Sequence, residues 1–167
     1  MSGGLALELH VGRSGRDHDD IDVGGIRRDV PALRSILSGW DVRVAAAGRL
    51  MAWSGDALED GLHQNNLWCR RATAGPWQLD VTIGEGDDGR WIYRRDRRIW
   101  LPWSQAILRT ASGIPYIAPE LQLLFKAKNP RPKDDVDAQV VIPVLDMARG
   151  DRLRRMLPLG HPWHARL

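Results

Sequence analysis

The hydrophobic pattern of the first quarter of the chain alternates in short runs. Residues 20–23 read Asp-Ile-Asp-Val, so that both acids fall on one face and both apolar residues on the other, as in a half-buried strand. We expect this strand to end at residues 24–25, which are both glycine. Residues 29–38 then begin with a potential N-cap and carry apolar residues at helical spacing, and residues 40–45 alternate again. The order strand, helix, strand favours an α/β arrangement.

The middle of the chain has the pattern of an antiparallel meander. Residues 67–71 and 77–83 are predicted to be strands, and the turn residues 73–76 separate them as in a hairpin. A second turn at residues 86–89 leads into a further extended segment at residues 90–94.

From Pro119 onward, helical spacing replaces alternation. Apolar residues at 121–125 mark one helix, and the prolines at 130 and 132 end it. Residues 136–145 indicate a second helix, with Pro143 near its end, and residues 149–157 a third. We therefore expect an α/β (α+β) chain with a core over residues 1–117. A C-terminal helical extension over residues 118–167 is predicted to pack on that core, within a single domain overall.

Composition narrows the class of protein. The 24 Lys and Arg exceed the 21 Asp and Glu only slightly, so the net charge of +3 gives weak attraction to anions. The single cysteine, Cys69, excludes an intramolecular disulfide framework and a Cys-rich zinc cluster, and we interpret it as a small buried hydrophobe. The chain has neither the pattern of a signal peptide nor an apolar stretch long enough to cross a bilayer. We expect a cytoplasmic protein with no membrane partner.

Three aspartates are the candidate catalytic residues. Asp20 and Asp22 lie at i and i+2 of a predicted strand, so their side chains project side by side. Ionisation of both carboxyl groups is unfavourable because of their mutual repulsion, unless a cation lies between them. Asp80 is the candidate third acid because it lies on the polar face of a strand otherwise interpreted as buried. Hard divalent ions such as Mg²⁺ take carboxylate oxygens together with substrate phosphates. The plain alternative for this pattern is a set of solvated surface acids.

Residues suited to phosphate binding precede the acids. Gly3 and Gly4 allow backbone amides to approach a phosphate, and Arg13 and Arg16 offer forked donors to its oxygens. Surface ion pairs between these arginines and neighbouring aspartates are an open alternative. For His18 the alternative is a polar residue at a strand edge that orients an adjacent acid.

These motifs resemble a known family. The run Gly-Gly-Leu-Ala-Leu at residues 3–7, followed by Gly-Arg-Ser-Gly-Arg-Asp-His-Asp-Asp-Ile-Asp at residues 12–22, resembles the signature of aminoglycoside adenylyltransferase-like proteins. Lincosamide nucleotidyltransferases share this signature, and residues 119–137 also resemble that family. The resemblance implies a DNA polymerase β-type nucleotidyltransferase fold, with a mixed, mainly antiparallel sheet flanked by helices. It also implies two Mg²⁺ ions and ATP or another NTP as the donor.

Carried over position by position, the resemblance places Asp20 and Asp22 on the metal pair and Asp80 on the third carboxylate. It places Gly3 and Gly4 on the glycines that approach the phosphate. The other positions predicted to bind the nucleotide are Arg13, Arg16, His18 and Lys126. The chain departs from the family in two ways: it begins two residues before Gly3-Gly4, where the family has a helix and a strand, and Leu5 replaces a tryptophan.

The predicted function is transfer of a nucleoside monophosphate, AMP in the first place, from an NTP to a hydroxyl of a small molecule. An aminoglycoside- or lincosamide-like antibiotic is the acceptor that the resemblance implies. The main rival is a non-catalytic nucleotide-binding or regulatory member of the same fold that lacks a complete phosphate loop. A nucleic-acid-binding module using the Arg and Trp content is a further rival, which the interleaved acids disfavour.

Overall fold

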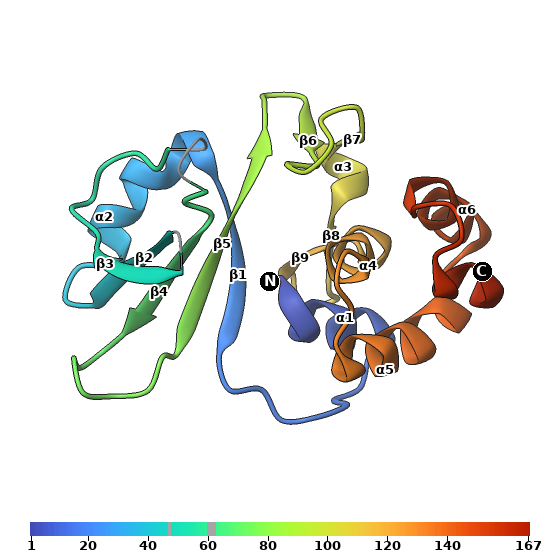
Figure 1. Cartoon of the computed structure of the whole chain (residues 1–167), viewed down its shortest axis with the longest axis horizontal. Helices are drawn as coiled ribbons and strands as arrows, with labels where there is room; N and C mark the ends of the chain where they lie inside the picture. Colours follow the sequence, from blue (N-terminus) through green and yellow to red (C-terminus); the bar gives the residue numbers. More distant parts are fainter. Residues whose placement is uncertain (47, 60–62) are drawn as a thin grey trace. The chain divides into compact units, whose positions relative to one another are not determined.

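The structure is a computed structural model that describes residues 1–46, 48–59 and 63–167 (Figure 1). The chain divides into two compact units. One consists of residues 17–103, and the other of residues 1–16 together with residues 104–167. We call them the sheet unit and the helical unit and describe each by itself.

The sheet unit is built on a mixed, mainly antiparallel sheet, as predicted (Figure 1). Its strands run in the order β3-β2-β4-β5-β6-β7, and β1 pairs with β5 outside this path. β1 is parallel to β5, whereas the other neighbouring strands are antiparallel. The strands are β1 (Ile21–Ile26), β2 (Asp41–Ala46), β3 (Arg49–Ala52), β4 (Asn66–Arg70), β5 (Leu79–Gly86), β6 (Arg90–Ile92) and β7 (Trp100–Pro102).

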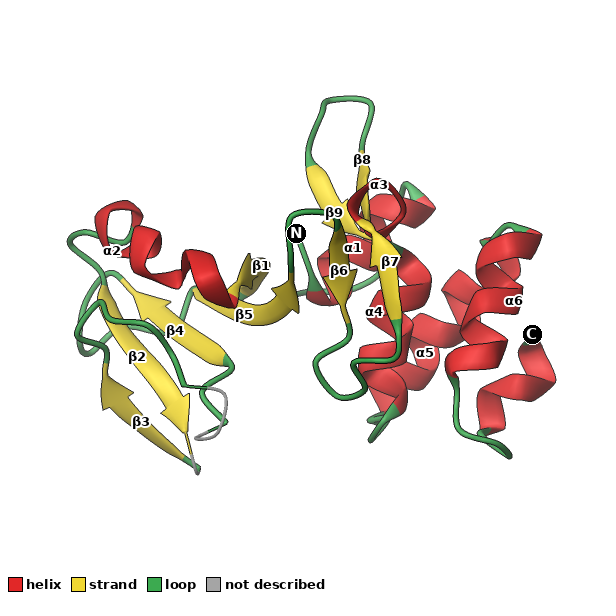
Figure 2. Ribbon diagram, turned by 90° about the horizontal axis from the view of Figure 1, so that it is seen from above, coloured by secondary structure: helices red, strands yellow, loops and turns green. Residues whose placement is uncertain are grey.

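One face of this sheet carries the core of the unit. The 3₁₀ helix η1 (Arg27–Ala32) contacts β1 and β5, and the short helix α2 (Leu33–Ile36) continues from it (Figure 2). Gly39, with a φ of +79°, turns the chain back into β2 in a conformation that side chains disfavour. Burial of the apolar residues on this face is the main stabilising term of the unit. The buried cluster consists of Val30, Leu37, Val42, Val44, Leu58, Leu67, Cys69, Val81 and Ile83.

Helix α4 is the buried central helix of the helical unit. α4 contacts α1, α5 and α6, and Leu121, Leu123 and Leu124 within it are buried. The helices are α1 (Gly3–Val11), α3 (Trp103–Ala106), α4 (Pro119–Ala127), α5 (Pro132–Val141) and α6 (Met147–Met156), with the 3₁₀ helices η3 (Ile142–Val144) and η4 (Pro162–Arg166). A small hairpin, β8 (Ile107–Arg109) and β9 (Pro115–Ile117), completes the unit. No helix in the described ranges is both long and apolar enough to span a bilayer.

Several boundaries differ from the prediction. β1 does not end at Gly24-Gly25 but runs through both glycines to Ile26, because each pairs with a residue of β5. The second C-terminal helix ends at Val141, and Pro143 lies in the separate turn η3, as expected for a residue that cannot donate to a helix. Residues 104–117 group with the helices. That the helical extension packs on the core stays a prediction.

Candidate metal and nucleotide site

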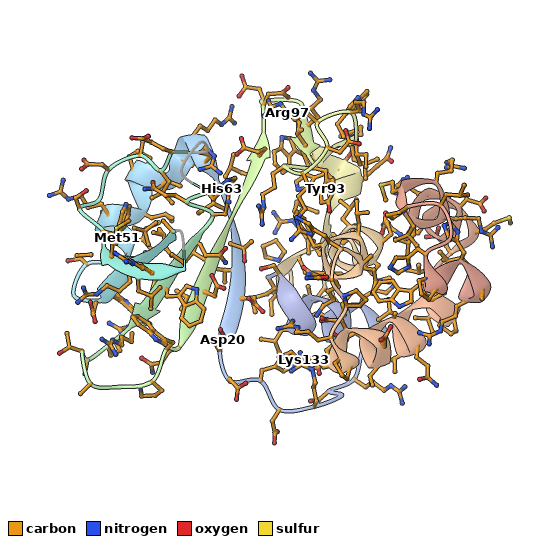
Figure 3. All side chains as sticks on the ribbon, viewed as in Figure 1. Asp20, Met51, His63, Tyr93, Arg97 and Lys133 are labelled. Carbon is orange, nitrogen blue, oxygen red and sulfur yellow. The ribbon has the colours of Figure 1, made fainter. Side chains whose placement is uncertain are left out.

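The pairing of β1 with β5 brings the three predicted acids together. Asp22 lies opposite Asp80, and the Ile21 N–H donates to the Gln78 carbonyl at 2.9 Å, which continues the same register. Because side chains alternate along a strand, Asp20, Asp22 and Asp80 project from one face. One carboxylate oxygen of each residue lies within 4.8 Å of the others. Figure 3 shows Asp20 at the start of β1, where the chain enters the sheet.

The next strand along the sheet supplies a fourth polar residue. In β4, Asn66 lies opposite Thr82, and Trp68 lies opposite Asp80, so that both Asn66 and Trp68 share the face of the acids. The Asn66 side-chain nitrogen donates to Asp80 Oδ1 at 2.8 Å and to Asp80 Oδ2 at 2.9 Å. Asn66 was not predicted from the sequence. The alternation in β4, with Leu67 and Cys69 buried and Asn66 and Trp68 half-buried, is the signal that indicates it.

The electrostatics of the site are set by burial and by like charges. Burial raises the pKa of Asp80 to about 6, and the charges of Asp22 and Asp20 act in the same direction. The hydrogen bond from Asn66 favours the charged form and opposes this rise. The pKa of Cys69, behind the acids in the core, is raised to about 11 by burial and by Asp80. Cys69 is therefore a buried thiol, as predicted.

The three acids fit a hard divalent cation. Their oxygens are the ligands that Mg²⁺ prefers, and the distances between them allow one ion to contact all three. A cation between them would also offset the repulsion among the acids, which adds to the effect of burial on the pKa of Asp80. Asp20, Asp22 and Asp80 are thus the residues that could hold a metal ion.

The predicted phosphate-binding residues fall in both units. Gly3 and Gly4 open helix α1 of the helical unit rather than a turn, and the Gly3 N–H donates to Gln122 Oε1 at 2.9 Å. Arg13 is exposed, and Arg16 lies with its Nε 4.0 Å from Asp137 Oδ1. His18 is half-buried and belongs to the sheet unit with the acids. Contacts between these residues and a phosphate stay predictions.

Lys126, the predicted C-terminal contact to the nucleotide, lies in an ion cluster. Its Nζ is 2.7 Å from Asp134 Oδ1 and 3.0 Å from Asp137 Oδ2, and its side chain is 7% exposed. Arg131 also donates to Asp134, at the start of α5. The charge of Lys126 is therefore balanced by neighbouring acids, and its role toward a nucleotide stays a prediction.

Asp20 and Asp22 at the start of β1, with Asp80 on the neighbouring β5, match the arrangement that the sequence resemblance implies. No protein-family model matches the chain, and no curated protein matches it significantly. The solution structure of the antibiotic-resistance factor ANT(2'')-Ia has a TM-score of 0.53 and 17% identity, over 92% of this chain and 78% of that chain. The crystal structure of ANT(2'')-Ia in complex with adenylyl-2''-tobramycin has a TM-score of 0.49 and 15% identity, over 99% of this chain and 86% of that chain.

The first of these structures shows a shared fold. At such identity the likeness concerns the fold alone, and it confirms the fold class that the sequence predicted, a mixed, mainly antiparallel sheet flanked by helices. The activity, the substrates and the residue roles require the chemistry of the site.

Proposed function

We propose that the chain is a Mg²⁺-dependent nucleotidyltransferase, which transfers a nucleoside monophosphate, AMP in the first place, from an NTP to a hydroxyl of a small molecule. The observation that carries this proposal is the convergence of Asp20, Asp22 and Asp80 within 4.8 Å on one face of the sheet. The fold shared with ANT(2'')-Ia and the sequence signature around Asp20 and Asp22 support it.

The proposal assigns metal binding, proton acceptance and side-chain positioning to different residues of the site. Asp20, Asp22 and Asp80 would hold the Mg²⁺ ions. Bound there, the ions would supply positive charge to neutralise the triphosphate and orient it for in-line attack. Asp80 accepts the proton of the acceptor hydroxyl, whose oxygen forms a bond to the α-phosphorus while the bond to the pyrophosphate leaving group breaks. Asn66 holds the Asp80 carboxylate in place for this role.

The remaining contacts and the acceptor are proposed from the resemblance. The residues assigned to the triphosphate are Gly3, Gly4, Arg13, Arg16, His18 and Lys126. Because an antibiotic-resistance factor shares the fold, an aminoglycoside- or lincosamide-like antibiotic is the acceptor to test first. An NTP donor requires a compartment that contains NTPs, so we place the protein in the cytoplasm.

The direct test is pyrophosphate release from each of the four NTPs with Mg²⁺, across a panel of aminoglycosides and lincosamides. We expect release that depends on both the acceptor and Mg²⁺ and that EDTA stops. The double variant Asp20→Asn/Asp22→Asn should be inactive, and Asp19→Asn, an exposed neighbour, should retain activity. Release that persists in the double variant would assign the activity to other residues.

A non-catalytic nucleotide-binding protein is the second candidate. One observation favours it: two of the proposed phosphate contacts, the Gly3 N–H and Lys126, already have partners within the helical unit. This candidate predicts saturable binding of a fluorescent ATP analogue without pyrophosphate release for any acceptor. Release with a single acceptor excludes it.

A further inference from the structure

The contact between Asn66 and Asp80 has an unusual symmetry. One nitrogen, Asn66 Nδ2, lies 2.8 Å from one oxygen of the Asp80 carboxylate and 2.9 Å from the other. A group nearly equidistant from both oxygens lies on the bisector of the carboxylate, on its open side. A cation chelated by both oxygens of Asp80 would occupy the same position.

The backbone holds Asn66 at this position. β4 pairs with β2 on one side and with β5 on the other, and Asn66 lies opposite Ala45 in β2 and Thr82 in β5. Its side chain is only half-exposed, between these neighbours. The amide must direct its nitrogen toward Asp80, because its oxygen would repel the carboxylate. A cation therefore displaces Asn66 only by breaking two hydrogen bonds to a charged acceptor.

We propose that Asn66 restricts Asp80 to coordination through one oxygen and thereby makes the site select Mg²⁺ or Mn²⁺ over Ca²⁺. This inference rests on the proposed function, since it assumes a cation between the acids. Ca²⁺ accepts six to eight oxygen ligands in flexible geometry and often takes both oxygens of a carboxylate. Mg²⁺ demands a near-octahedral shell, which carboxylates enter through single oxygens. Asn66 is thus a positioning residue that acts on metal choice through Asp80.

Cation binding to the full-length protein tests the inference without any substrate. Mn²⁺ bound to the protein is followed by electron paramagnetic resonance and displaced by Mg²⁺ or by Ca²⁺, which gives both affinities on one scale. In Asn66→Ala the position between the oxygens is open, so we expect affinity for Ca²⁺ relative to Mg²⁺ to rise about 10-fold, the scale of effects for residues that orient metal ligands. Asn66→Ser provides the same test if the alanine variant does not fold.

Thr82→Val is the matched control. Thr82 lies opposite Asn66 on the same face, two residues along β5 from Asp80, and the substitution keeps the shape of the side chain. We expect its ratio of affinities to equal that of the wild type. A ratio in Asn66→Ala and Asn66→Ser within about twofold of the wild type, or an equal shift in Thr82→Val, would overturn the inference.

Failure of the proposed function gives a different result. If the wild type binds Mg²⁺ and Asp80→Asn weakens that binding, the site is a metal site whatever Asn66 does. A wild-type protein that binds neither Mn²⁺ nor Mg²⁺ overturns the metal site and the inference about Asn66 together.

Discussion

Two carboxylates, one in each unit, have pKa values shifted in opposite directions, and one has a neutral hydrogen-bond donor whereas the other has cationic donors. Asp80 in the sheet unit accepts both hydrogen bonds of a neutral amide, and burial raises its pKa to about 6. Asp134 in the helical unit is 2% exposed and accepts from Lys126 and Arg131. Burial pushes the pKa of Asp134 upward, but the hydrogen bonds from Arg131 and Lys126 together outweigh it and hold the pKa well below its usual range.

Glu120 is a second buried acid of the helical unit with cationic partners. Its side chain is 0% exposed, and it accepts from Arg149 Nη1 at 3.0 and 3.1 Å and from Arg152 Nη1. These contacts bind the buried helix α4 to α6. A buried acid whose charge is balanced by the chain's own cations serves the structure of the unit.

The two carboxylates differ in whether a cation of the chain balances their charge: Asp134 has such partners, and Asp80 has a neutral amide. The helical unit supplies cations to its buried acids. In the sheet unit, burial raises the pKa of Asp80, and the neighbouring acids Asp22 and Asp20 add to the rise. Carboxylates with raised pKa values are typical of sites that bind ions or move protons. The proposed function thus gives the same residue type a structural task in one unit and a chemical task in the other.

The largest expected effect is on the rate of nucleotide transfer and comes from substitution of Asp80. Asp80→Asn keeps the size of the side chain but removes its charge and its ability to accept a proton. We expect the rate of nucleotide transfer to fall about 10³-fold or more, since removal of a general base typically costs that much. Much of the nucleotide affinity should remain. Steady-state kinetics combined with equilibrium nucleotide binding separates the two, and a wild-type rate in this variant would mean that Asp80 has been misassigned.

The second effect is on stability and tests the ion cluster around Asp134 in the helical unit. Lys126→Met removes the cation shared by Asp134 and Asp137 and leaves buried acids short of a partner. We expect the free energy of unfolding to fall by about 3 kcal/mol, the usual cost of breaking a buried ion pair from one side. Urea denaturation measures this change. Lys128→Met, an exposed position two residues away, is the control and should change stability by less than about 0.5 kcal/mol.

An equal loss of stability in both lysine variants would show that the cluster contributes little beyond the helix itself. A small loss in Lys126→Met, combined with weaker nucleotide binding, would instead support the predicted contact between Lys126 and the nucleotide. The helical unit would then take part in the chemistry.

Local alternation predicted much of the acid-bearing sheet. Asp20 and Asp22 were placed on one face because side chains alternate along a strand, and Asp80 was placed on the polar face of its strand for the same reason. Both strands are present, and the register sets Asp22 opposite Asp80. That register depends on pairing between segments nearly 60 residues apart. A pattern within one strand does not contain it. The alternation in β4 places Asn66 on the half-buried face, but its contact with Asp80 depends on the pairing of β4 with β5.

The helical unit shows the other limit of sequence reasoning. Residues 3–11 begin with two glycines, which favour a turn, yet they form α1 because Ala6 and Leu7 are buried within the unit. Tertiary packing here overrides local preference. The partners of Lys126 are likewise set by the packing of α4 against α5, so the sequence did not indicate its ion pairs with Asp134 and Asp137. The contact of Lys126 with a nucleotide stays a prediction.

The smallest expected effect is a gain in the free energy of unfolding when the charge of Asp80 is removed, whereas removing a partner of Asp134 should lower it. In metal-free protein at pH 8, Asp80→Asn should be more stable than the wild type by about 1 kcal/mol. The shift of the Asp80 pKa from 3.8 to about 6 corresponds to more, at about 1.4 kcal/mol per pKa unit, but partial exposure and the loss of one hydrogen bond from Asn66 reduce it. The folded state holds the Asp80 proton more tightly than the unfolded state. This contribution to stability is complete below pH 3.8 and is lost as the pH rises through about 6.

Urea denaturation in EDTA at pH 8 and pH 3.5 tests this sign. The advantage of Asp80→Asn should be present at pH 8 and nearly absent at pH 3.5, where the wild-type carboxyl is protonated in the folded state and mostly protonated in the unfolded state. Asp19→Asn, an exposed neighbour, should show no such difference between the two pH values. Mg²⁺ at pH 8 should stabilise the wild type more than Asp80→Asn, because the variant lacks one of the three carboxylates proposed to hold the cation. If Asp80→Asn is instead less stable at pH 8, Asp80 is compensated like Asp134, and the contrast between the two units disappears.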